Sequence, residues 1–429
     1  MRNRPKPAPI KLDTSRITHL EVPFKFLTYV FGGGVDHVDE AEHPMPSRPF
    51  DPITPVRATG VRGQLRFWWR ATTGSRCVSL TEMREREAAI WGGIWDSGDG
   101  IEAGSVGISV ASSGATPEPV PIFGWESGKR FPRETEEGRA ISYAAFPMRP
   151  QGNNGRERDP RSSVWNHSRA QYVLSIDILD PTYSEEIALA VSAWLIAGGY
   201  GGRTTRGFGS VALASECPDT ILDTPQKLRD ALAKLGTPKV EGVPSLVDDE
   251  SHWAFANGGD PHRSWENAIK KLQNFRQGPG LGRNPGQQHN RPGRSRWPEP
   301  DAIRTLTRRS SSLHSDRVHQ SDAFPRADFG MPIIFHFKDR GEPDDQTLQP
   351  SSKESRLPSP LIIKPIADGR GMALRLSNIE VPDKLYLSGV NREVHKSVRR
   401  AELETLPDHQ KRLLDPDPVT AFMNEFRSK

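Results

Sequence analysis

The feature that most constrains this chain is a cluster of glycines near its middle. Residues 198–211 read GGYGGRTTRGFGSV, with glycine at Gly198, Gly199, Gly201, Gly202, Gly207 and Gly209. Glycine adopts positive backbone φ and allows close approach of another backbone, so the stretch predicts a tight, unshielded loop. An apolar segment with helical spacing precedes this glycine loop (residues 198–211), and a strand-like segment follows it. Nucleotide-binding loops have the opposite order, because there the glycines follow a strand and open a helix.

Arg203 and Arg206 are the only charged residues of the glycine loop. A guanidinium offers paired hydrogen-bond donors to an anion, so two arginines on such a loop are placed to meet phosphate. A flexible turn with solvated arginines is the alternative interpretation. The loop by itself leaves both open.

A second basic segment, RATGVRGQLRFWWRATT at 57–73, has the spacing of an amphipathic helix. Its apolar face consists, at i, i+4 and i+7, of Val61, Leu65 and Trp68. Its basic stripe consists of Arg62, Arg66 and Arg70. These like charges repel one another, and a polyanion laid along the stripe would relieve the repulsion. Trp69 lies between the two faces and could offer its ring to a base. The alternative is a buried helix whose arginines reach solvent or pair with acids.

Composition indicates a globular protein of about two domains, since the chain has 429 residues and 26% of them are charged. The only cysteines are Cys77 and Cys217, which excludes a disulfide framework and a cysteine-built zinc site. No apolar run reaches the roughly 18 residues that span a bilayer, and the N-terminus lacks the apolar core of a secretory signal. We therefore expect a cytoplasmic protein with no membrane contact, no cofactor and no bound metal.

The order of predicted elements favours an α+β fold. Alternating or helical apolar patterns occupy, in order, residues 18–30, 57–73, 104–110, 171–179, 182–197 and 209–214. This order of strand, helix, two strands, helix and strand is the split β-α-β unit of the ferredoxin-like fold. Pro23 makes the first strand an edge strand or gives it a bulge. We place the first domain at 1–215, a helical and basic flexible insertion at 216–330, and the strands of a second small domain at 331–429.

Two further segments carry charge. Residues 276–326 contain ten arginines and only four acids, an excess of six positive charges; phosphate contact and simple solvation remain open for them. The segment Asp36-His37-Val38-Asp39-Glu40, with His43 close by, holds acids and imidazoles that could serve a metal-dependent or histidine-based endoribonuclease. A solvated acidic loop is the favoured interpretation, because its spacing matches no known metal motif.

With these residues in view, the chain resembles the RAMP (repeat-associated mysterious) proteins of type III CRISPR systems. It looks most like subunit one of the type III-B, or Cmr, effector complex. The motifs that carry the resemblance are VRGQLRFWWRA at 61–71, the glycine loop, RWPEPDAIR at 296–304, DFGMPI at 328–333 and LPSPLIIKPI at 357–366. The glycine loop indicates only a RAMP protein, whereas the first and third motifs together are more specific.

The resemblance implies two ferredoxin-like domains in tandem and a non-catalytic capping subunit of an RNA-guided ribonucleoprotein in antiviral defence. Such a subunit would contact the 3′ part of the CRISPR RNA, the 5′ part of the target RNA, or both. Its protein partners would be backbone and neighbouring RAMP subunits and a small helical subunit. RNA contacts would come from Arg62, Arg66, Arg70, Arg203 and Arg206, with Trp69 and Tyr200 as stacking platforms. An endoribonuclease acting on CRISPR RNA or target RNA is the alternative function.

Overall fold

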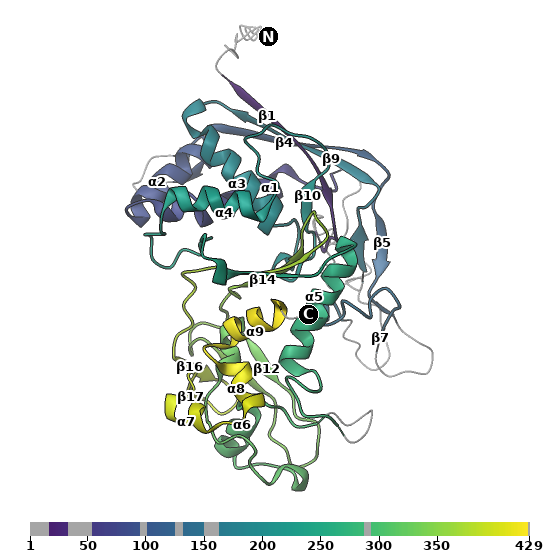
Figure 1. The fold of residues 1–429 in the computed structure, drawn as a ribbon, viewed down its shortest axis with the longest axis vertical. Helices are drawn as coiled ribbons and strands as arrows, with labels where there is room; N and C mark the ends of the chain where they lie inside the picture. Colours follow the sequence, from purple (N-terminus) through teal and green to yellow (C-terminus); the bar gives the residue numbers. More distant parts are fainter. Residues whose placement is uncertain are drawn as a thin grey trace, which may run out of the picture.

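The computed structural model describes residues 17–32, 54–94, 101–124, 132–149, 163–286 and 293–427. Its N-terminal unit is a four-stranded antiparallel sheet in the order β10-β1-β9-β4. Its strands are β1 (Thr18–Phe26), β4 (Val106–Gly114), β9 (Ala170–Ile178) and β10 (Val211–Leu213). Its helices are α1 (Ala58–Ala71), α2 (Leu80–Trp91) and α3 (Ser184–Ala197), followed by α4 (Pro225–Leu235). The sheet and its helices occupy the upper part of Figure 1. The predicted ferredoxin-like order of the first domain is therefore present.

The first strand differs from the prediction in one respect: β1 lies in the centre of the sheet, between β10 and β9. Its proline is tolerated because of where the missing N–H would point. The Pro23 carbonyl accepts a hydrogen bond from Ala214 N at 3.0 Å, directly after β10 ends at Leu213. A strand residue directs its N–H and C=O towards the same neighbour, so the proline nitrogen faces the end of β10 and no ladder bond to β9 is lost.

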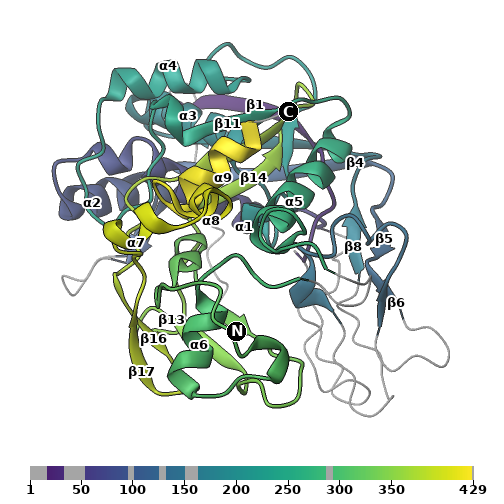
Figure 2. The same cartoon turned by 60° about the horizontal axis from the view of Figure 1, so that its bottom comes forward.

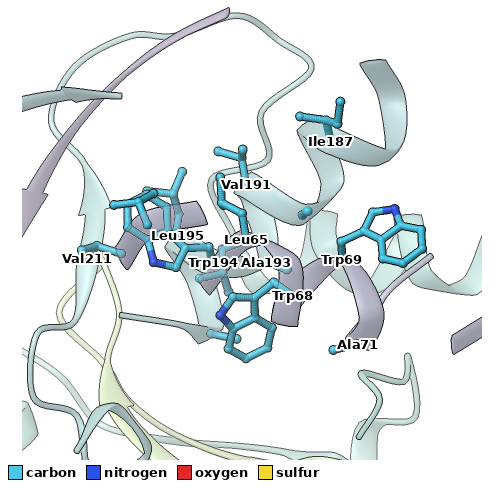
Figure 3. Packing of buried hydrophobic residues seen from close by; sticks show 14 of the residues in the cluster. Leu65, Trp68, Trp69, Ala71, Ile187, Val191, Ala193, Trp194, Leu195 and Val211 are labelled. Carbon is cyan, nitrogen blue, oxygen red and sulfur yellow. The ribbon is translucent and has the colours of Figure 1, made fainter. Parts of the chain in front are cut away.

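One apolar core joins this sheet to α1 and α3. The inward face of β1 comprises Leu20, Val22, Phe24 and Phe26, all buried. The helices add Leu65, Trp68, Val191 and Trp194, which are at most 2% exposed. Figure 3 shows Trp68 and Trp69 directed to different sides of this cluster. The helical spacing in 57–73 therefore predicted the buried face of α1 correctly, except that Trp69 is buried as well.

The second unit is a three-stranded antiparallel sheet in the order β11-β15-β14. Its elements are β11 (Trp253–Ala256), α5 (Pro261–Gln277), β14 (Leu361–Pro365), β15 (Gly371–Arg375) and α9 (Pro418–Arg427). Chain order and sheet order match a ferredoxin-like unit without a fourth strand among the described residues. The fold is therefore α+β as predicted. The boundary expected at residue 330 differs from this topology, because β11 and α5 lie within 216–330 and belong to the second sheet.

A third, small sheet has its own apolar core and the order β12-β13-β16-β17. Its strands are β12 (Ile333–Phe335), β13 (Gln346–Gln349), β16 (Lys384–Leu387) and β17 (Arg392–His395), with α6 (Glu299–Thr307) against it. It lies at the bottom of Figure 1. Helices α7 (Arg400–Thr405) and α8 (Asp408–Leu414) precede α9. The remaining strands form short pairs: β2 (Gly93–Ile94) with β3 (Ile101–Glu102), β5 (Glu118–Pro121) with β8 (Ser163–Asn166), and β6 (Phe123–Gly124) with β7 (Arg133–Glu134).

Among the residues that the structure describes, no helix is both long and apolar enough to cross a membrane.

Candidate nucleic-acid interface

The glycine loop is folded tightly on itself and against the second unit. Tyr200 N donates to Gly209 O at 2.9 Å, and Gly199 pairs with Ser210. Gly207 has a φ of +80°, and a Cβ there would lie 2.6 Å from the Trp265 ring of α5 and 2.8 Å from the carbonyl oxygen of Ile363 in β14. The glycines thus allow the two units to approach each other through this loop.

Arg206 connects the two units. Its guanidinium donates to the carbonyl of Leu361 in β14 at 2.8 Å and to the hydroxyl of Ser359 at 3.2 Å. Its own carbonyl accepts the indole N–H of Trp265 at 2.8 Å. Burial, together with the positive charges of Arg276 and Arg203, lowers the pKa of Arg206 to about 9. The side chain is therefore fixed by the protein at the junction and is not a solvated arm.

We expect the substitution Arg206→Ala to lower the free energy of unfolding by about 2 kcal/mol, because it removes charged donors from a buried junction. Leu361 is fully buried, so water cannot easily replace the lost donor at its carbonyl. Urea unfolding followed by tryptophan fluorescence measures the change. The control is Arg400→Ala, which truncates an arginine whose side chain is 93% exposed. Equal stabilities of the two variants would contradict a structural role for Arg206.

Three arginines carry positive charge at this junction without an acidic partner among the residues that the structure describes. Arg203 donates to the carbonyl of Ala144 at 3.0 Å, and burial lowers its pKa. The guanidinium carbon of Arg276, in the last turn of α5, lies 5.3 Å from the centre of the Phe329 ring, and its buried Nε has no hydrogen-bond partner. Neither these two nor Arg206 forms an ion pair within the described ranges. The junction therefore keeps a concentrated positive charge, which suits a polyanion.

The arginines of α1 have different partners. Arg62 donates to the carbonyls of Trp91 at 2.8 Å and Val106 at 3.0 Å, which ties α1 to the end of α2 and the start of β4. Arg66 pairs with Glu87 at 2.8 Å, and Arg70 lies 3.9 Å from the same carboxylate. The side chains of Arg66 and Arg70 are 35% and 41% exposed. Two guanidinium groups thus share one buried acid and retain a net positive charge.

A hydrogen bond to the Tyr200 side chain joins α1 to the glycine loop, without the arginine side chains of either segment. Arg57 N, at the start of α1, donates to the Tyr200 hydroxyl at 3.0 Å. Among the described contacts, the α1 arginines share no partner with Arg203 or Arg206.

The two predicted stacking platforms are both buried, which corrects the expectation for them. Trp69 is fully buried and its indole N–H donates to Glu186 at 2.8 Å. Tyr200 is only 3% exposed. A base cannot reach either ring in this structure, because neighbouring side chains and backbone already cover both.

Residues 23–212, which contain β1, α1 and the glycine loop, match the model of the RAMP superfamily. These residues form a RAMP domain. The expected resemblance to RAMP proteins is thereby confirmed for this part of the chain, and Arg203 and Arg206 lie on the glycine-rich loop of this domain.

Several solved structures are similar to the chain. The apo form of Cmr1 from Pyrococcus furiosus is 13% identical, with 87% of this chain and 94% of that chain covered and a TM-score of 0.45. A chain of a type III-B Cmr-beta complex bound to cognate target RNA and AMPPnP is 11% identical, with coverage of 95% and 98% and a TM-score of 0.42. Cmr6 from Pyrococcus furiosus is 10% identical, with coverage of 48% and 100% and a TM-score of 0.24. The search among curated proteins found no match.

The acidic segment at 36–40 and His43 lie outside the described residues of the RAMP domain. Within the described ranges, no group of three or more histidine, cysteine, aspartate or glutamate side chains could hold a metal ion. His167, another isolated imidazole, is buried and its Nδ1 lies 2.7 Å from the Tyr172 hydroxyl. Burial lowers the pKa of His167 to about 4.

Most described arginines of the basic segment at 276–326 are paired within the protein. Arg304 binds both Asp301 and Glu342, and Arg309 binds Asp344. The acids at 342 and 344 lie beyond the segment, which is why a local charge count overstated its excess. Arg276, in the last turn of α5, forms no ion pair among the described residues, and its positive charge helps to lower the pKa of Arg206 in the glycine loop. The only sequence signal for a basic site that includes Arg276 is the arginine-rich composition of the segment.

Proposed function

We propose that this protein is a non-catalytic RNA-binding subunit of a type III-B CRISPR (Cmr) effector complex, most like its subunit one. The observation that carries the proposal is the group of Arg203, Arg206 and Arg276 at the junction of a RAMP domain with the second unit, without a described acidic partner. Phosphate is the ligand that several clustered guanidinium groups favour. The motifs shared with Cmr subunit one support the assignment to this complex.

The proposed role is to hold an RNA backbone, not to read bases. In RNA-guided systems base pairing between guide and target supplies sequence specificity, so a protein subunit needs only phosphate and shape contacts. The absence of an exposed aromatic ring at Trp69 and Tyr200 fits this division of labour. The RNA would be the 3′ part of the CRISPR RNA, the 5′ part of the target RNA, or both, and neighbouring Cmr subunits would complete its path.

The α1 arginines supply a second part of the proposed interface. Arg66 and Arg70 are partly exposed, and Glu87 can neutralise only one of them. A phosphate that approaches this stripe would therefore meet a net positive charge. Arg62 is proposed to contribute mainly by holding α1 in place, since both of its described hydrogen bonds end on backbone carbonyls.

The proposal predicts that Arg276→Gln combined with Arg203→Gln weakens binding of single-stranded RNA to a similar extent for unrelated sequences. Each lost phosphate contact should reduce the slope of log K against log salt by about 0.7. Fluorescence anisotropy with labelled RNA at several salt concentrations measures both quantities.

Arg400→Gln is the matched control, since it removes an exposed arginine of α7. Its affinity and salt slope should equal those of the unmodified protein. RNA affinity and salt slope that stay unchanged in the double variant would refute the proposed interface. A second pair, Arg66→Gln with Arg70→Gln, separates the contribution of α1 from that of the junction.

A further inference from the structure

One aromatic side chain close to the arginine junction is exposed to solvent. Phe146 begins a short 3₁₀ helix, Phe146–Met148, and is 59% exposed. Arg203 Nε donates to the carbonyl of Ala144, two positions before Phe146, at 3.0 Å. Two residues of chain span at most about 7 Å. The backbone that presents the Phe146 ring is therefore bonded directly to a junction arginine.

The turn that carries Phe146 is firmly held against the second unit. Its apolar residues are at most 1% exposed and belong to the core cluster that contains α5; they are Ile141, Ala144, Ala145 and Met148. Ala145 N donates to Ile141 O at 2.9 Å, and Met148 N donates to Ala145 O at 2.8 Å. Strands β5 and β8, which precede and follow this turn in the chain, lie beside α5 in both views of the fold (Figures 1 and 2). The exposed ring therefore stands on a packed support.

Two further aromatic residues near the same arginine, Tyr143 and Phe31, are partly exposed. Burial lowers the pKa of Arg203 and of Arg206, and the nearby Tyr143 hydroxyl opposes this shift in both. Gly202 N donates to Phe31 O at 2.7 Å, and a Cβ at Gly202 would lie 2.7 Å from the Phe31 ring. Because Gly202 directly precedes Arg203, the Phe31 ring lies against the glycine loop beside that arginine.

Arg203 has hydrogen-bond donors left for a phosphate. Its Nε is bonded to Ala144, whereas its two terminal nitrogens donate to no residue that the structure describes. Arg206 differs, because its terminal nitrogens are used on Leu361 and Ser359. A guanidinium with two free terminal nitrogens suits the paired oxygens of a phosphate. Arg203 is therefore both fixed in place and able to receive an anion.

We propose that Phe146 stacks an unpaired RNA base next to a phosphate held by Arg203, with Tyr143 and Phe31 bordering the same site. A nucleotide joins its base and its phosphate through one ribose, so a ring and a guanidinium anchored two residues apart can bind both parts. Every base has a π face, so stacking tolerates any sequence and agrees with a subunit that does not read bases. The ligand is single-stranded RNA, because the bases of a duplex are already paired and stacked. This inference rests on the proposed function and adds a contact that phosphate binding alone does not require.

The test compares a short single-stranded RNA with an oligomer of the same length whose nucleotides lack bases. Both carry a terminal fluorophore, and anisotropy measures their affinity for the full chain. We expect Phe146→Ala to weaken RNA binding about tenfold and to leave the affinity for the base-free oligomer unchanged. The salt slope should also stay unchanged, because no phosphate contact is lost. Phe146→Trp should keep the RNA affinity, since it supplies a ring, whereas Phe146→Leu should lose it.

Leu313→Ala is the matched control, because Leu313 is an apolar residue that is 66% exposed in the segment between α6 and β12. It should change neither affinity. The stacking site is overturned if Phe146→Ala binds RNA as tightly as the unmodified protein, or if it weakens binding of both oligomers equally. If Arg203→Gln with Arg276→Gln still weakens RNA binding in that case, the proposed function stands without the stacked base. RNA binding that is insensitive to these arginines and to Phe146 overturns both.

Discussion

Replacing Gly209 with alanine is expected to destabilise the folded chain by about 4 kcal/mol or more, well above the usual effect of one substitution. Gly209 has a φ of +60°, and a Cβ there would lie 1.9 Å from the carbonyl oxygen of Tyr200. The backbone cannot easily move away. Gly209 N donates to Tyr29 O at 2.7 Å, and Gly209 O accepts from Tyr200 N at 2.9 Å. Relief of the overlap must therefore break the loop's own hydrogen bonds.

Gly236 offers a matched control for this prediction. Its φ is +77°, yet a Cβ there would meet no atom within 4 Å. Gly236→Ala should cost only the backbone strain of an alanine at this φ with a ψ of −168°, about 1–3 kcal/mol. Urea unfolding of both variants, followed by tryptophan fluorescence, separates the two contributions. If Gly209→Ala lowers the free energy of unfolding no more than Gly236→Ala does, the close packing at Gly209 does not contribute to the stability of the glycine loop.

Local patterns predicted much of the RAMP domain because its signals are local. Alternating apolar residues in β1 and β9, and the i, i+4, i+7 face of α1, each reflect a single element against one core. The glycine loop was expected between a helix and a strand, and it joins α3 to β10. The segment TYSE at 182–185 has the sequence form of a capping box, but no such box is formed, because Asp180 accepts from Thr182 N and α3 starts at Ser184.

What the sequence could not predict are the partners of side chains across long separations. Arg206 bonds Leu361, which is 155 positions away, and Arg66 bonds Glu87 of another helix. An arginine pattern predicts positive charge, but it does not predict whether the guanidinium groups bind acceptors of the protein or of a ligand. Trp69 shows the same limit. Helical periodicity placed it between an apolar face and a basic face. Because α1 packs on two sides, the residue is buried.

The second unit was harder to delimit because the chain leaves its sheet and returns. Strand β11 is only four residues long, and β14 follows more than one hundred positions later. The small sheet takes β12 and β13 from the intervening segment and β16 and β17 from the segment after β15. Strands that are close in sequence therefore belong to different sheets. The local alternation of apolar residues predicts a strand but not the sheet to which it belongs.

Lys364→Ala is the second substitution for which we expect a large loss of stability, about 3 kcal/mol or more. Lys364 lies in β14 and is fully buried. Its Nζ donates to Gly198 O at 2.8 Å and to Leu195 O at 3.2 Å, at the C-terminal end of α3. A positive group is favourable at that end of a helix, where carbonyls lack partners. The second unit thus caps a helix of the RAMP domain, and alanine would leave both a void and unpaired carbonyls.

The same lysine predicts a specific pH dependence. Burial lowers the pKa of Lys364 to about 7, compared with the ordinary value of 10.5. Between these two values the unfolded chain binds the proton and the folded chain does not, so this group makes stability rise with pH. The slope is at most about 1.4 kcal/mol per pH unit. Below about pH 7 the ammonium is charged in both states and the contribution of the group no longer changes.

Lys364→Met isolates this contribution, since it keeps a long apolar stem and removes the titrating amine. The free energy of unfolding, measured in urea at several pH values from about 7 to 10, should rise more for the unmodified protein than for Lys364→Met. Other groups whose pKa is shifted by burial, such as Cys77, titrate in both proteins and cancel in the difference. A difference that stays constant over this range would show that Lys364 keeps its proton in the folded state. The two carbonyls at the end of α3 would then hold an ammonium ion rather than a neutral amine.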